Sequence, residues 1–347
     1  MRGGAALAAL IAAWFGASVV AIASAKSILV AAPCPATLCA IQLGVAAVGL
    51  RQLTPTSTPS REREWWHVFG IAASYACGFL LTNAAIALAA PSFVETFKAA
   101  EPLSTVGLAM LVLGERERAA TYASLAPIVA GVAMASSSKV TFSLAGMALA
   151  LASNVSFSGR AVLTKALKRQ FPSAPTSGSD MQLFYHVSRL GFWLLLPFAV
   201  LLDAHVLVRA LLSSGDGGGG SDMDGASSNA TLEDGGTSSS NADGAAPSAA
   251  RLLAWIVING TAHAAYNGVS FAVLGRVSVA THAVLNIVRR IVMIATAAVI
   301  FGTPITLFQW AGVALAGAGV GAFARSKNGP QPRLLPEYMD AGKMRAV

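Results

Sequence analysis

Long, continuous runs of hydrophobic residues dominate the chain. Ten such runs have about the length that a helix needs to cross a bilayer, and short polar segments separate them. Helices and closed barrels alone satisfy their backbone hydrogen bonds in lipid, and non-alternating Ala, Leu and Val indicate helices. The pattern predicts an all-α polytopic membrane protein with ten transmembrane helices. The runs cover approximately 4–25, 31–50, 66–88, 92–113, 119–136, 143–166, 182–204, 251–274, 278–301 and 305–324.

Composition excludes the other broad classes of protein. Of the 347 residues, 55% are hydrophobic and 12% are charged, whereas about 25% charge is usual in soluble domains. The net charge of +8 comes from Lys and Arg between the runs. On the ten-helix reading, 15 of them lie on the side of the membrane that holds both termini, and 4 lie on the opposite side. The positive-inside rule therefore predicts that both termini face the cytosol-equivalent side. No basic face for nucleic acid and no cysteine spacing for a metal is present in the sequence.

The two halves of the chain resemble each other. Shifted by 186 residues, the segment 122–136 overlies 308–322, so the fourth and fifth runs match the ninth and tenth. Five helices per half make the halves inverted, which is typical of secondary transporters. We therefore expect a first repeat at 1–140 and a second at 141–325, followed by a tail at 326–347. Within the second repeat, the Gly/Ser-rich segment 210–250 is predicted to be a disordered insert.

Three cations lie inside runs that the repeat relates. Lys98 is in the fourth run, and Arg289 and Arg290 are in the ninth. A charge at mid-membrane is costly and usually faces a polar cavity, and Arg and Lys both suit phosphate. Glu95 or Glu101 can pair with Lys98 along the helix. The alternative to a ligand site is that an arginine pairs with Glu101 or with backbone carbonyls.

Other polar residues in the runs give weaker signals. Tyr266 and Thr82, again in repeat-related runs, offer hydroxyls to a phosphate, although either is also typical of an interhelical contact. Arg160 is expected to snorkel to the basic end of its helix. His263 has no metal-ligand spacing. No catalytic motif, phosphate-binding loop or cofactor motif is present in the sequence, so we expect neither an enzyme nor an ATP-driven pump, and no cofactor.

The sequence resembles the plastid phosphate translocator and triose-phosphate transporter family, within the drug/metabolite transporter superfamily. The similarity is carried by KAAEPLSTVGLAMLVLGE, SLAPIVAGVAMAS, MALALASNVSFSGRAVLTK and NGVSFAVLGRVSVATHAVLNIVRRIVMIATAAVIFGTPIT. It covers nearly the whole chain apart from 210–250. The resemblance implies exchange of inorganic phosphate for a phosphorylated C3, C5 or C6 metabolite.

The resemblance also implies a set of substrate-binding residues, and the chain departs from it at two positions. The family's phosphate-binding positions fall on Lys98, Arg289, Arg290, Tyr266 and Thr82, with Arg289 in place of a family Lys. A family His that contacts the distal end of the substrate falls on Phe79. Because an apolar ring donates no hydrogen bond to a carboxylate, we expect altered specificity and disfavour 3-phosphoglycerate.

The leading hypothesis is a monomeric antiporter that works by alternating access in the lipid bilayer, without nucleic acid partners. The favoured location is the plastid envelope or another membrane around the plastid. We expect no transit sequence before the first hydrophobic run, and this expectation favours the alternative of a Golgi or endoplasmic reticulum nucleotide-sugar antiporter. A membrane scaffold fits less well, because it would not need unpaired cations within the membrane. A lipid-modifying enzyme fits less well, because the sequence lacks a set of residues for acid–base catalysis.

Overall fold

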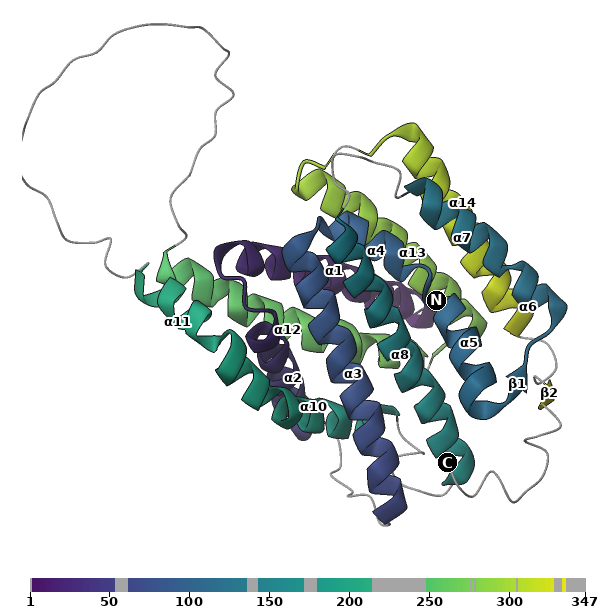
Figure 1. Ribbon diagram of the computed structural model, residues 1–347, viewed down its shortest axis with the longest axis horizontal. Coiled ribbons are helices and arrows are strands. Elements are labelled where there is room, and N and C mark those ends of the chain that lie inside the picture. Colours follow the sequence, from purple (N-terminus) through teal and green to yellow (C-terminus); the bar gives the residue numbers. More distant parts are fainter. Residues whose placement is uncertain are drawn as a thin grey trace, which may run out of the picture.

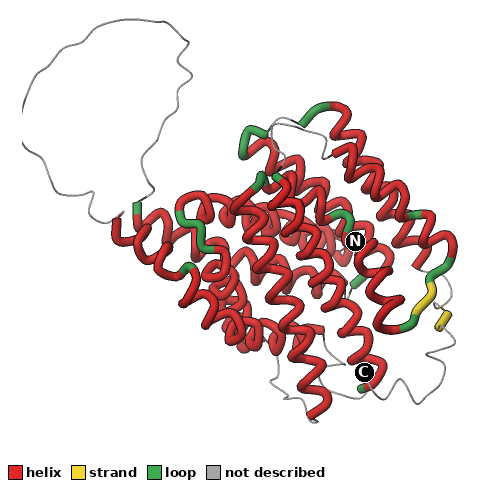
Figure 2. Tube along the Cα trace, in the orientation of Figure 1, coloured by secondary structure: helices red, strands yellow, loops and turns green. Residues whose placement is uncertain are grey.

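The computed structural model describes residues 2–53, 62–135, 143–171, 180–213, 248–274, 276–277, 279–303, 305–327 and 333–334. These residues form a bundle of helices (Figures 1 and 2), so the all-α prediction is confirmed. The helices are α1 (Arg2–Ala31), α2 (Pro35–Leu53), α3 (Glu62–Leu88), α4 (Pro91–Lys98), α5 (Glu101–Leu113), α6 (Ala119–Ala123), α7 (Leu125–Ala135), α8 (Leu144–Gln170), α10 (Asp180–Leu202), α11 (Ala204–Ser213), α12 (Ala249–Leu274), α13 (Val279–Ile300) and α14 (Leu307–Lys327). Among the described residues, strand structure is limited to β1 (Glu115–Arg116), which pairs antiparallel with β2 (Arg333–Leu334).

Each of the ten hydrophobic runs coincides with one helix or with two consecutive helices. The run 92–113 is divided into α4 and α5, and the run 119–136 into α6 and α7. Within the described part of the chain, five helical segments meet a strict test of length and hydropathy for spanning a membrane. They are Ala5–Ala31, Glu64–Leu88, Pro91–Leu113, Asp180–Leu202 and Leu307–Ser326. The chain is thus polytopic, while the total of ten spans stays a prediction.

The main helix pairings can be compared with the two expected halves. Helix α1 packs along α12, and α3 packs along α8. In the expected repeat, α1 corresponds to α8 and α3 to α12, so the two pairs are equivalent. Helix α7 packs along α14, and α2 along α10, and each of these pairs joins two repeat-related helices. These pairings are symmetric between the two expected halves, but the inverted repeat itself stays a prediction, and its boundary at 140/141 lies outside the described residues.

The insert and the tail are mostly outside the described residues. Within the expected insert, residues 210–213 are the last turn of α11, and α12 begins at Ala249. Residues 214–247 are not described, so the predicted disorder there stays a prediction. Helix α14 extends to Lys327, two residues into the expected tail.

Glycines bring the backbones of α7 and α14 into contact. A Cβ atom on Gly131 would lie 2.5 Å from the carbonyl oxygen of Gly312, closer than any real Cβ contact. Small residues at helix interfaces permit such approach in membranes, where packing drives association. The two helices run side by side at one edge of the bundle (Figure 1).

A buried carboxylate fixes the other end of the bundle. Asp203, at the corner between α10 and α11, accepts hydrogen bonds from the backbone N–H groups of Ala36 (2.7 Å) and Thr37 (2.9 Å) at the start of α2. The Thr37 hydroxyl donates a third bond of 2.6 Å. Asp203, from a distant part of the chain, therefore accepts hydrogen bonds from N–H groups at the start of α2 that lack partners within the helix. Its negative charge also interacts favourably with the positive N-terminal end of the α2 dipole.

Candidate functional site

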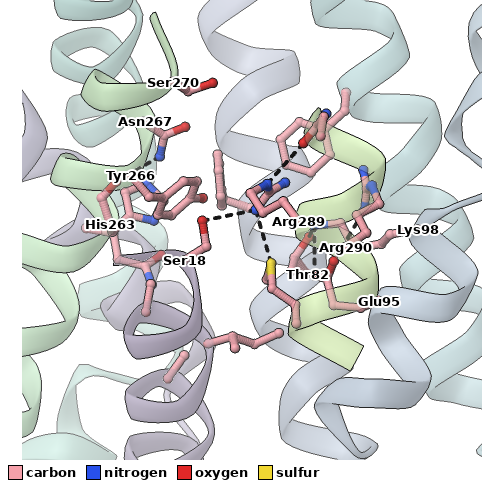
Figure 3. A pocket seen from close by; sticks show the side chains of 18 of the residues that line it. Ser18, Thr82, Glu95, Lys98, His263, Tyr266, Asn267, Ser270, Arg289 and Arg290 are labelled. Atoms are coloured by element: carbon pink, nitrogen blue, oxygen red, sulfur yellow. Dashed lines mark hydrogen bonds and ion pairs between the residues drawn. The ribbon is translucent and has the colours of Figure 1, made fainter. Parts of the chain in front are cut away.

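A cavity of about 330 Å³ lies at the centre of the bundle, lined by α1, α2, α3, α4, α5, α8, α12 and α13. Residues from both halves of the chain meet there (Figure 3). All six residues singled out in the sequence line this cavity, although they come from four different helices: Phe79, Thr82, Lys98, Tyr266, Arg289 and Arg290.

A helix break positions Lys98 in the cavity wall. Helix α4 ends at Lys98 and α5 starts at Glu101, with Ala99 and Ala100 between them. The cause is Pro102, which has no N–H group to continue the α-helical ladder. The N–H groups of Ala99 and Ala100 instead bond three residues back, at 3.1 and 3.0 Å. The predicted single span 92–113 is therefore wrong as one continuous helix, because Pro102 interrupts it.

Polar side chains of α8 support the broken helix. The Asn154 amide donates a 2.9 Å hydrogen bond to the Phe97 carbonyl oxygen. The Ser158 hydroxyl lies 2.8 Å from that of Thr105 in α5. Because irregular backbone in a membrane requires such partners, these contacts fix where Lys98 and Glu101 lie.

Arg290 is held by two carboxylates. Its guanidinium lies 2.7 Å from Glu101 Oε2 and 3.3 Å from Glu95 Oε2. Lys98 is 3.9 Å from Glu95 and donates a 3.3 Å hydrogen bond to the Thr82 hydroxyl. Of the alternatives that the sequence left open, Arg290 adopts the pairing with Glu101, while Glu95 is the local partner of Lys98.

Arg289 has a different environment. Among the described residues it forms no ion pair with a carboxylate; it donates to Asn286 Oδ1 at 3.0 Å and to Ser18 Oγ at 3.2 Å. Its guanidinium carbon lies 5.6 Å from the Trp14 ring and 5.9 Å from the Tyr266 ring. Adjacent positions on a helix point about 100° apart, so α13 presents one paired and one uncompensated cation to the same cavity.

The expectation for Arg160 is wrong. Its side chain lines the cavity instead of extending to the helix end, and its guanidinium carbon lies 5.5 Å from the Tyr75 ring. Within the described part of the chain, its Nε atom is buried without a hydrogen-bond partner. Four cationic and two carboxylate side chains therefore line the cavity, which gives the wall a formal charge of +2.

Two further features of the cavity wall did not follow from the sequence. Amide side chains tie four helices together: Gln42 donates to Asn259 (2.8 Å) and accepts from Asn83 (3.1 Å), and Asn259 donates to the Ala21 carbonyl (2.7 Å). The sequence feature that could have predicted this network is the presence of an Asn or Gln within each of several apolar runs. The second feature is His263, which lines the cavity beside Tyr266.

Comparison with known proteins gives this cavity its context. The sequence model of the Triose-phosphate Transporter family matches residues 5–324. Phosphoenolpyruvate/phosphate translocator 2, chloroplastic, of Arabidopsis thaliana is 30% identical over 317 residues, which cover 89% of this chain and 74% of that protein. Phosphoenolpyruvate/phosphate translocator 1, chloroplastic, of Oryza sativa subsp. japonica is 29% identical, covering 89% and 69%.

A second kind of relative is named for a different substrate, triose phosphate. The triose phosphate/phosphate translocator of non-green plastids, chloroplastic, from Brassica oleracea var. botrytis is 26% identical, covering 89% of this chain and 70% of that protein. The family match extends from α1 to α14 and includes every residue that lines the cavity. The chain therefore belongs to the triose-phosphate transporter family.

Proposed function

We propose that the chain is a secondary antiporter that exchanges inorganic phosphate for a phosphorylated C3, C5 or C6 metabolite. The observation that carries the proposal is the formal charge of +2 on the cavity wall. A phosphoryl group bears about −1.5 to −2 at neutral pH, so one phosphate dianion balances this charge. The names of the chloroplast relatives support the same substrates, and they support a plastid envelope or another membrane around the plastid as the location.

The phosphate is assigned to the cations of α4 and α13. Lys98 supplies a point charge, while Arg289 and Arg290 supply forked donors that match phosphate oxygens. Arg289, without a carboxylate among the described residues, has the most to gain from an anion. The hydroxyls of Thr82 and Tyr266 complete the proposed site, and Thr82 already contacts Lys98 at 3.3 Å.

The remainder of the substrate is assigned to the wall around Phe79. This ring packs edge-on against Tyr75 (4.8 Å between centroids) and Phe157 (5.0 Å). Arg160 lies over Tyr75 and offers a cation to a second acidic group. We propose that Phe79 and its neighbours determine which organic phosphate fits.

Charge compensation also explains obligate exchange. An empty carrier that reorients must enclose an uncompensated +2 wall in a low-dielectric interior, which is costly. A loaded carrier is near neutral and reorients at lower cost. The symmetric pairings of α1 with α12 and α3 with α8 suit rocking of the halves around a central site. The cavity is formed within one chain, so we propose a monomer.

The test is uptake of labelled phosphate into proteoliposomes. We expect rapid uptake when the lumen holds phosphate or a phosphorylated metabolite, and little uptake into empty vesicles. Equal uptake into empty and loaded vesicles would refute obligate exchange. Preferential exchange with luminal nucleoside monophosphate and external nucleotide sugar would instead support the nucleotide-sugar antiporter.

A further inference from the structure

His263 is a buried polar residue that the phosphate site leaves without a role. It is 2% exposed, and its Nε2 atom is buried with no hydrogen-bond partner among the residues that the structure describes. It lies on α12 with Tyr266, Asn267 and Ser270, at the i, i+3, i+4 and i+7 positions that share one helix face, and all four line the cavity. Figure 3 shows them along one wall, with Arg290 and Lys98 on another.

Aromatic rings surround this imidazole. Its centroid lies 4.6 Å from that of Phe79 and 5.3 Å from that of Tyr266. Such rings position the imidazole by packing, but their carbon edges satisfy no polar nitrogen. An unsatisfied buried group costs about 1–3 kcal/mol, and polar residues in membranes usually serve a partner or a pathway. The partner for Nε2 is therefore expected to enter through the cavity.

The imidazole and the Lys98 ammonium contact different parts of the wall, whereas Arg289 and the imidazole both lie against the Tyr266 ring. The Lys98 ammonium lies 5.0 Å from the Phe157 ring, which lies 5.0 Å from Phe79, which in turn lies 4.6 Å from His263. Two rings thus stand between the ammonium and the imidazole along the wall. A ligand whose phosphoryl group sits at Lys98 and the arginine pair extends its remaining atoms along these rings.

We infer that His263 is a specificity-determining residue that contacts the organic end of the transported phosphate ester. Its Nε2 atom forms a hydrogen bond with a carboxylate or carbonyl oxygen beyond the phosphoryl group. This inference rests on the proposed function, and it makes the wall around Phe79 selective for oxygen-bearing substrates despite the apolar ring. Inorganic phosphate has no such oxygen, so His263 separates organic substrates from phosphate.

The experiment compares two competitors of phosphate exchange in proteoliposomes. Phosphoenolpyruvate carries a carboxylate beyond its phosphoryl group, whereas ethyl phosphate carries no further oxygen. The variants are His263→Phe, which keeps a ring and removes the nitrogens, and His263→Gln, which retains a donor and an acceptor. His186→Phe is the matched control, because His186 is equally buried among rings in α10 but does not line the cavity.

We expect His263→Phe to lower the preference for phosphoenolpyruvate over ethyl phosphate about tenfold, the effect of one hydrogen bond. His263→Gln should retain most of the preference, and His186→Phe all of it. An unchanged preference in His263→Phe, or an equal loss for both competitors, would overturn the inference in favour of a structural role. If the Phe variant does not insert, His263→Leu replaces it in the same comparison.

The two proposals fail in different ways. Wild-type protein that exchanges no phosphate would overturn the proposed function. In that case, thermal stabilisation of the detergent-solubilised protein by phosphoenolpyruvate and by ethyl phosphate still tests His263. Selective loss of the first stabilisation in His263→Phe would support the contact, and its retention would refute it.

Discussion

Replacing Arg290 by Gln should damage the protein in two separable ways. The Arg290 side chain is 15% exposed, and its guanidinium is bridged to Glu101 at 2.7 Å and to Glu95 at 3.3 Å. Breaking a buried ion pair costs about 3–5 kcal/mol, because the remaining carboxylates lose their partner. We expect the free energy of unfolding to fall by about 3 kcal/mol, the lower end of this range, because the Glu101 side chain is 26% exposed to solvent. Loss of a charged donor to phosphate should cost another ~1.5–3 kcal/mol of binding free energy.

The double variant Arg290→Gln/Glu101→Gln separates these effects. It removes one cation and one carboxylate, so the wall keeps its formal +2 charge, and most of the stability should return. Phosphate affinity should remain roughly ten- to 150-fold below that of the wild type, since the donor itself is still absent.

The measurements are thermal unfolding in detergent without ligand, and the half-saturation constant of phosphate exchange. Arg189→Gln is the matched control, because this arginine is also within a helix, lies 5.7 Å over the Tyr185 ring and does not line the cavity. Unchanged stability of Arg290→Gln would show that the ion pairs are unimportant. Full recovery of phosphate affinity in the double variant would show that Arg290 only neutralises Glu101.

Three further predictions concern the contacts that position the site. Asn154→Leu removes the 2.9 Å hydrogen bond to the Phe97 carbonyl, so it should lower thermal stability and phosphate affinity together; loss of neither would show that the α4–α5 break is supported elsewhere. Asp203→Leu leaves the first N–H groups of α2 without their acceptor and should lower the free energy of unfolding by about 1–2 kcal/mol. Phosphate affinity should be unchanged, and an altered affinity would contradict this purely structural role. Gly131→Leu places a side chain against α14 and should reduce correctly inserted protein, as scored by size-exclusion chromatography; a normal monodisperse peak would contradict the close packing.

The hydrophobic pattern by itself determined the helical elements. Runs of about 20 apolar residues have no alternative to helix in lipid, so α3, α10 and α12 coincide with the expected spans to within a few residues. The sequence also predicted that Lys98, Arg289 and Arg290 share one cavity. A charge within an apolar run usually faces the protein interior, and the expected repeat relates the fourth and ninth runs.

Tertiary structure decided what each of those charges does. Sequence gives the number of cations and carboxylates, but the partner of Arg290 depends on how α13 packs against the α4–α5 break, which brings Glu95 and Glu101 within reach. The same holds for Arg160, whose direction into the cavity depends on the pairing of α8 with α3. His263 had no sequence motif because its neighbour Phe79 is 184 positions away. Long-range packing thus determines electrostatic balance, since Coulomb energy depends on distances that the chain order does not specify.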